Sequence, residues 1–254
     1  MPQDTLYILS APGESPIPAG PNRFPAVLSH RIRPSGQLLR LNASPSPHGG
    51  IMVVCGCDEL CSGPPRPLSA ALLQECLRHT PRGLLLDPEA PNHFYPELIR
   101  LLSPKLTKLG ITLFLPEPLA CHAPGCRVLI PAAVSGGSLS LRLQEATEQY
   151  GPDRVVVCLD PVAEEFTLPC PTGSGRPLSR EQLSALLQEQ HSPPHFSSAL
   201  CTRYFTFFRG ENLHLVLCDD PNCLREKYNC ARRCGLSRFL LLRRDIHSIP
   251  DFLL

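Results

Sequence analysis

Two carboxylates close one apolar segment of the chain. The run Arg82-Gly83-Leu84-Leu85-Leu86 leads directly into Asp87, Pro88 and Glu89. Side chains at positions i and i+2 of a strand point to the same side, so we expect Asp87 and Glu89 to emerge together where the strand meets its loop. Two carboxyl groups placed in this way predict an acid/base pair.

Two further apolar runs end at an acid in the same way. Residues 111–115 lead to Glu117 and residues 154–159 lead to Asp160, with a proline beside each acid. Continuous hydrophobicity is typical of parallel strands buried on both faces. Several strands that deliver acids to one rim indicate the active face of a (β/α)8 barrel. Acids and prolines are also common turn residues, and this plainer interpretation fits any one of these acids taken alone.

Strands and helices alternate along most of the chain, which favours βαβ units and a parallel sheet. The predicted strands are residues 5–10, 26–31, 37–41, 51–55, 83–86, 111–115, 128–131, 154–159 and 239–242, and the predicted helices are residues 68–78, 95–109, 139–150, 179–190 and 221–234. Residues 204–208 and 213–218 flank a turn and predict a β-hairpin. We therefore expect an α/β fold, a single (β/α)8 TIM barrel over residues 1–254, with this hairpin inserted before the last helix and strand.

The composition excludes several classes of protein. The 254 residues are 43% hydrophobic, enough for one sizeable core, and the net charge of +1 with scattered basic residues argues against nucleic acid as a partner. No segment approaches the roughly 18 to 20 apolar residues of a membrane span, and the first residues lack the pattern of a secretory signal. We expect a cytoplasmic protein that needs no cofactor and does not bind membranes. Its oligomeric state is left open.

Cysteines are numerous, at thirteen in the chain. Two groups are candidates for a zinc site: Cys55, Cys57 and Cys61, and Cys218, Cys223, Cys230 and Cys234. Neither has the closely paired spacing of a zinc ribbon, so we predict no metal site. The thiols are interpreted mainly as small buried hydrophobic groups in a reducing compartment, with structural zinc as the alternative.

The chain resembles glycoside hydrolase family 18, and in particular its spore-cortex-associated branch. The fourth-strand motif of that family, D-G-x-D-x-D-x-E, aligns without a gap with residues 82–89, where the last two acids match as Asp87 and Glu89. Residues 24–41 are similar to the second-strand segment, through Ser29-His30-Arg31 and Pro34-Ser35-Gly36-Gln37-Leu38. Residues 204–242 are similar to the closing block of the family through Phe207, Gly210, His214, Asp219, Asp220, Lys227, Ala231, Gly235 and Leu236.

The resemblance implies a divergent hydrolase of glycans that contain N-acetylglucosamine, such as chitin or peptidoglycan, with spore association as an alternative location. In the substrate-assisted retaining route of the family, Glu89 would be the general acid/base and Asp87 would orient the acetamido group that attacks. Glu117, Asp160 and Asp58 would replace missing partners in substrate binding.

The chain also departs from the family pattern. Arg82 and Leu85 stand at the first two motif aspartates, Pro88 replaces an aromatic residue, and the chain has no tryptophan on which a sugar could stack. A second function therefore stays open: a catalytically weak or inactive barrel that binds glycans or acts as a scaffold, with its carboxylates covered by residues 169–177 or paired with Arg82. A third, a metal-assisted hydrolase using rim acids with His93 or His122, lacks any close histidine motif.

Overall fold

The computed structural model describes residues 3–15, 17, 20–41, 46–56, 61, 63–88, 93–171, 173–189 and 193–243. The chain divides into two compact units. The first comprises Met1–Ile130, Ala146–Cys158 and Leu236–Arg244, and the second comprises Pro131–Glu145, Leu159–Gly235 and Asp245–Leu254. Each unit is described by itself.

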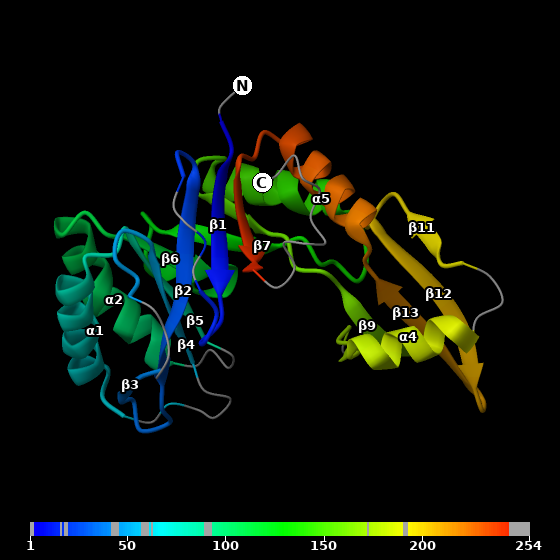
Figure 1. Ribbon diagram of the computed structural model, residues 1–254, viewed down its shortest axis with the longest axis horizontal. Helices are drawn as coiled ribbons and strands as arrows, with labels where there is room; N and C mark the ends of the chain where they lie inside the picture. The colour runs from blue at the N-terminus through cyan, green and yellow to red at the C-terminus, as the bar shows by residue number, and fades with distance from the viewer. Residues whose placement is uncertain are drawn as a thin grey trace. The chain divides into compact units, whose positions relative to one another are not determined.

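Eight parallel strands close into a barrel (Figure 1). They are β1 (Thr5–Ser10), β2 (Arg23–Ile32), β4 (Ile51–Cys55), β5 (Gly83–Asp87), β6 (Thr112–Pro116), β7 (Arg127–Pro131), β8 (Val155–Cys158) and β14 (Arg238–Leu242). Strand β1 pairs in parallel with both β2 and β14, and this joins the two ends of the series. The closed ring confirms the predicted TIM barrel.

Helices follow the middle strands of the barrel. Helix α1 (Pro65–His79) connects β4 to β5, α2 (Phe94–Lys108) connects β5 to β6, the short 3-10 helix η1 (Glu117–His122) connects β6 to β7, and α3 (Leu139–Tyr150) connects β7 to β8. Figure 1 shows α1 and α2 side by side. The described residues between β1 and β2 contain no helix, and β3 (Leu38–Arg40) lies antiparallel to β2 where a second helix would stand.

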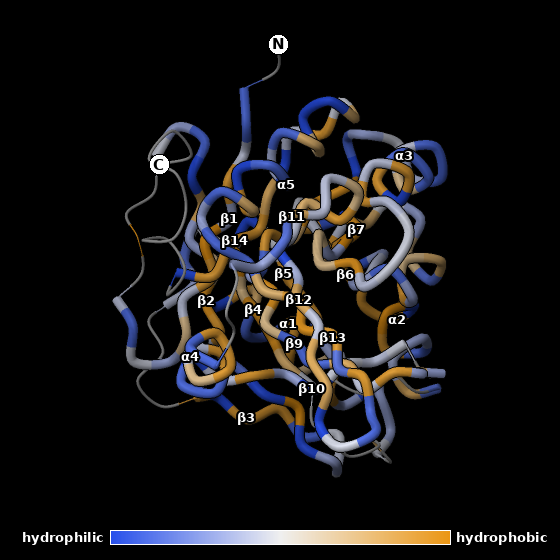
Figure 2. The backbone as a smooth tube through the Cα atoms, turned by 90° about the vertical axis from the view of Figure 1, so that its right-hand side faces the viewer, coloured by the Kyte–Doolittle hydropathy of each residue, from blue (hydrophilic) through white to orange (hydrophobic). Residues whose placement is uncertain are grey.

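The barrel interior is filled by side chains from every second strand position, and the strands are drawn largely in the hydrophobic colour in Figure 2. The rings of Tyr7 and Phe114 meet edge to face at 5.1 Å in this interior. A Cβ on Gly83 would lie 2.5 Å from Phe114 Cε2, so only glycine fits at the start of β5. Leu85 belongs to the same interior cluster. Since side chains alternate along a strand, Asp87 is the next inward position after Leu85.

The second unit contains a five-stranded antiparallel sheet in the order β10-β9-β13-β12-β11. Its elements are β9 (Ala163–Leu168), β10 (Arg176–Pro177), α4 (Arg180–Glu189), β11 (His195–Ser197), β12 (Thr202–Arg209) and β13 (Asn212–Cys218). Strands β12 and β13 form the predicted hairpin. The insertion is larger than the predicted hairpin, because β13 also pairs with β9, which pairs with β10, and β12 also pairs with β11. In addition, Leu186 of α4 packs on Phe205 and Val216.

Helix α5 (Pro221–Arg233) is fixed to this sheet by two consecutive acids. Asp219 accepts hydrogen bonds from the Val162 backbone N–H at 2.9 Å and from the fully buried Lys227 ammonium at 2.5 Å. Asp220 caps the helix by accepting from the Cys223 N–H at 2.8 Å and also accepts from the Arg203 guanidinium at 2.6 Å. These two acids, which carry part of the family resemblance, therefore hold the fold together.

Candidate active site

Asp87 is the last residue of β5, at the carboxyl end of a barrel strand. It lies directly beside Cys55, its register partner on β4, and follows the inward-facing Leu85. Asp87 is nevertheless exposed to solvent. Protein atoms around the carboxyl group exclude part of its solvent, and this desolvation raises the pKa of Asp87 above the usual carboxyl value.

Arg82 does not neutralise Asp87. It immediately precedes β5, whereas Asp87 ends that five-residue strand, so the two are separated by about 16 Å along the strand. The Arg82 guanidinium instead lies over the Phe24 ring, 4.7 Å from its centroid. Asp87 therefore does not form the ion pair with Arg82 that was considered for an inactive scaffold.

Glu117 begins η1 directly after β6, the strand next to β5. Because the two strands are parallel, Asp87 and Glu117 lie at the same, carboxyl end of the barrel. Asp160 follows the end of β8 by two residues and is half-buried, but it belongs to the second unit. Glu89 and Asp58 fall outside the described residues.

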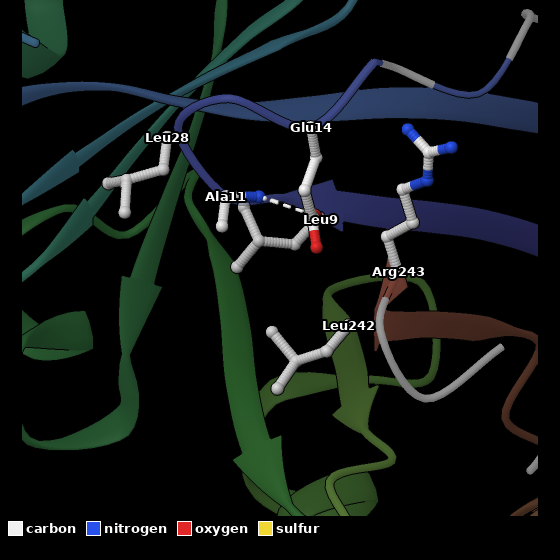
Figure 3. Close-up of a pocket in the computed structure, with 6 residues that line it drawn as sticks. All are labelled: Leu9, Ala11, Glu14, Leu28, Leu242 and Arg243. Carbon is white, nitrogen blue, oxygen red and sulfur yellow. Dashed lines mark hydrogen bonds between the residues drawn. The ribbon is translucent and has the colours of Figure 1, made fainter. Parts of the chain in front are cut away.

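A small cavity opens at the carboxyl end of β1, β2 and β14 (Figure 3). Its volume is about 140 Å³, and it is lined by Leu9, Ala11, Glu14, Leu28, Leu242 and Arg243. A larger cavity, of about 270 Å³, includes Gly110 and Thr112 and lies at the amino end of β6. The smaller cavity is the one at the end of the barrel that also carries Asp87.

Neither charged residue of this cavity was predicted from the sequence. A signal was available for Glu14, which follows the strand at residues 5–10 and a Pro-Gly turn and so repeats the strand-then-acid pattern. Arg243 directly follows β14 and carried no comparable signal.

Two carboxylates elsewhere, one buried and one half-buried, already contact basic side chains. Glu165 in the second unit contacts Arg176, Arg209 and His214, the last two at 2.9 and 2.8 Å. Burial alone would raise the pKa of Glu165, but the Arg176 hydrogen bond and the surrounding positive charges lower it overall. A carboxylate held in this way is poorly suited to donate a proton near neutral pH.

Glu75 on α1 is the second engaged carboxylate. Its Oε2 lies 3.3 Å from the Nε2 atoms of both His30 on β2 and His79 on α1. Burial lowers the pKa of His30, although the Glu75 charge opposes this effect. The cluster joins α1 to β2, so it serves the packing of this helix on the barrel.

The described residues contain no group of three or more histidine, cysteine, aspartate or glutamate side chains arranged to hold a metal ion. His93 precedes α2 and His122 ends η1. Several cysteines are buried in apolar surroundings, which raise the pKa of Cys76 and of Cys223 to about 12. Cys57 is outside the described part of the chain. No helix within the described ranges is long and apolar enough to cross a membrane.

Solved structures share this fold over nearly the whole chain. The spore cortex-lytic enzyme SleL of Bacillus megaterium QM B1551 matches with a TM-score of 0.63 at 10% identity, over 95% of this chain and 70% of that one. A chitinase from Chromobacterium violaceum matches with a TM-score of 0.64 at 15% identity, over 98% and 96%. SleL of Bacillus cereus matches with a TM-score of 0.61 at 14% identity, over 94% and 71%.

No family profile and no curated protein sequence matches the chain. At these low identities the structural matches establish the fold alone. The chain therefore has the barrel fold of these chitinase and cortex-lytic structures, which confirms the resemblance at the level of fold.

Proposed function

We propose that the protein is a divergent glycoside hydrolase that cleaves N-acetylglucosamine-containing glycans at the carboxyl end of its barrel. The observation that carries this proposal is Asp87, a carboxyl group with a raised pKa at an inward position of the barrel mouth. It stands two residues before Glu89 in a fold shared with chitinases and cortex-lytic enzymes.

In the proposed mechanism, Glu89 protonates the leaving glycosidic oxygen while the acetamido oxygen of the substrate attacks the anomeric carbon. Asp87 accepts a hydrogen bond from the acetamido N–H and stabilises the positive charge that develops on this group. Water then opens the cyclic intermediate with Glu89 as the base, so the anomeric configuration is retained. Glu117, Asp160 and Asp58 are proposed to bind substrate.

The glycan is proposed to be chitin-like or peptidoglycan-like. The solved relatives include two enzymes described as spore cortex-lytic and one described as a chitinase. A spore location would fit a substrate like that of the cortex-lytic enzymes. Comparing the rates of hydrolysis of chitin oligomers and of cortex fragments would distinguish the two substrate classes.

A second function, a glycan-binding or scaffold barrel without catalysis, is favoured by Leu85. This side chain is 2% exposed in the barrel core at the position where the family motif has an aspartate, so Asp87 lacks that carboxylate partner. Under this alternative the chain would bind the same glycans without cleaving them.

One experiment separates these functions. Glu89→Gln and Asp87→Asn are compared with the wild type on N-acetylglucosamine oligomers and on cortex fragments, with Glu211→Gln in the exposed β12–β13 turn as the matched control. Hydrolysis by the wild type and the control, reduced about 10²- to 10⁴-fold in Glu89→Gln, supports the hydrolase. Binding without turnover in all four proteins supports the scaffold.

We also propose that residues 1–254 act as one domain, with the five-stranded sheet as an insertion between the seventh and eighth barrel strands. One cooperative transition in calorimetry would support this organisation. Two separate transitions would contradict it.

A further inference from the structure

We infer that Cys201, Cys230 and Cys234 form a site of reversible oxidation, at which a low-molecular-weight disulfide such as oxidised glutathione joins the first two in a disulfide bond. All three residues belong to the second unit of the chain, and their thiols are free in the structure. The site lies on the helix that follows the inserted sheet and takes no part in the proposed glycan chemistry.

Cys230 lies at the centre of the three-thiol cluster. Its thiol shares one side-chain hydrogen bond with Cys201 and another with Cys234. Cys230 is 3% exposed in the last turn of α5, and the Cys234 backbone N–H donates to its carbonyl oxygen at 3.2 Å. Cys201 is 4% exposed and directly precedes β12. Thiols in direct contact allow thiol–disulfide exchange to pass from one sulfur to the next.

The surroundings hold the two outer thiols in place. The Cys201 thiol donates to the Ser198 carbonyl oxygen at 3.6 Å, and the Cys234 thiol donates to the Ser140 carbonyl oxygen at 3.8 Å. The backbone of Cys201 has a φ of 53°, in the left-handed region that residues other than glycine rarely adopt. A conformation of this kind persists only where the surrounding structure enforces it. The fold therefore fixes the position of Cys201 against α5.

Cys234 is the residue at which the oxidant enters, because it is half-buried while the other two cysteines are buried. Its thiolate attacks oxidised glutathione, forms a mixed disulfide and releases one glutathione thiolate. Cys230 loses its proton to solvent, attacks the Cys234 sulfur and releases the second glutathione thiolate. Two protein thiols are thereby oxidised, and one glutathione disulfide is reduced to two glutathione molecules.

The bond between Cys230 and Cys234 then passes to Cys201. Residues four apart in a helix have Cβ atoms about 5 to 6 Å apart, whereas an unstrained disulfide requires about 3.5 to 4.5 Å. Strained disulfides are exchanged more readily than relaxed ones. The Cys201 thiolate attacks the Cys230 sulfur and expels the Cys234 thiolate, which takes up a proton. The final bond joins α5 to the turn before β12.

Burial makes this reaction slow near neutral pH. It raises the pKa of Cys201 to about 11 and also raises the pKa of Cys234. Thiolates are therefore scarce, and the cluster stays reduced where reduced glutathione is in excess. A sustained rise in the proportion of oxidised glutathione is the condition that would form the bond.

Disulfide mapping of the full chain tests the site. The reduced protein is freed of reductant, incubated with oxidised glutathione at about pH 8.5, where thiolates are more abundant, then alkylated and digested with trypsin. Trypsin places each cysteine of the cluster on its own peptide, residues 181–203, 228–232 and 234–238. Mass spectrometry should find the first peptide joined to the second, and an excess of reduced glutathione should reverse the bond.

Serine variants test the order of the steps, and an unchanged thermal midpoint under reducing conditions verifies their fold. Cys234→Ser should slow formation of the bond by about tenfold or more, because the accessible thiol is lost. Cys201→Ser should stop the exchange and leave the peptide of Cys230 joined to that of Cys234. Cys121→Ser, at an exposed cysteine outside the cluster, is the matched control and should leave the rate unchanged.

A second readout measures stability. The bond would close a loop of about 30 residues, so the oxidised protein should have a thermal midpoint about 5 to 15 °C above that of the reduced protein. Wild-type protein in which Cys201 and Cys230 are recovered alkylated, or joined to glutathione, would overturn the site whether or not the variants fold. Equal rates in Cys234→Ser and Cys121→Ser, or a midpoint unchanged by oxidation, would also overturn it.

Discussion

Replacing Lys227 by methionine should destabilise the protein strongly. The Lys227 and Asp219 side chains are both fully buried, and their nitrogen and oxygen atoms lie 2.5 Å apart. Methionine fills a similar volume but leaves the Asp219 carboxylate without its counter-charge. Among the described residues, the Val162 N–H and the Thr202 hydroxyl would then remain to stabilise it. Removing one partner of a buried ion pair typically costs about 3 to 5 kcal/mol.

The free energy of unfolding from urea titration, with the thermal midpoint as a second measure, tests this expectation. For a chain of this size the loss corresponds to a fall in the midpoint of about 6 to 20 °C. Lys108→Met at the exposed end of α2 is the matched control and should change the free energy by less than about 0.5 kcal/mol. Adding Asp219→Asn to Lys227→Met should recover part of the loss, because the orphaned charge is removed. A loss below about 1 kcal/mol for Lys227→Met would refute the reasoning.

Three further predictions follow from the local environments. The raised pKa of Asp87 means that its ionised form opposes folding. Asp87→Asn should therefore increase the free energy of unfolding at pH 7 while reducing turnover, and the gain in stability should vanish in acid. A loss of stability at pH 7 would contradict this. The lowered pKa of His30 means that the folded chain binds this proton more weakly than the unfolded chain, so the free energy of unfolding should decline as the pH falls below about 6.5. In urea titrations, His30→Gln should reduce this dependence of stability on pH. An unchanged pH dependence would count against the prediction. Ser179 and Gln182 form reciprocal hydrogen bonds of 3.2 and 2.9 Å at the start of α4. Ser179→Ala should therefore lower the free energy of unfolding by about 1 kcal/mol. No change would show that this cap is dispensable.

The local sequence pattern was sufficient to predict the strands of the barrel. The strands at residues 5–10 and 51–55 and the helix at residues 139–150 have the expected bounds, because apolar runs are continuous in the strands and glycine and proline follow the helix. The alternation of strands and helices predicts a parallel sheet, and its closure was expected from the acids at the strand ends and from the family resemblance.

The inserted sheet could not be predicted from local pattern. Strand β9 contains adjacent glutamates, and its place in the sheet depends on pairing with β13, some fifty residues later. Glu165 can be buried there only because Arg176, Arg209 and His214 surround it. Such compensation between distant residues has no signature in a short window of sequence.

Only those residues of the candidate site that directly follow a barrel strand could be predicted from the sequence. Asp87 and Glu117 follow apolar strands and lie at their carboxyl ends as expected. Glu14 and Arg243 reach the cavity from loops whose course depends on the closed barrel. The catalytic role of Glu89 stays a prediction from the motif.

The anomeric configuration of the first product tests the central claim most directly. The wild type is incubated with the N-acetylglucosamine tetramer, and ¹H NMR follows the new reducing ends before they mutarotate. Substrate-assisted hydrolysis retains configuration, so the account predicts that the β-anomer forms first and that Glu89→Gln forms no product. Initial release of the α-anomer, or no new reducing ends from the wild type, would contradict it.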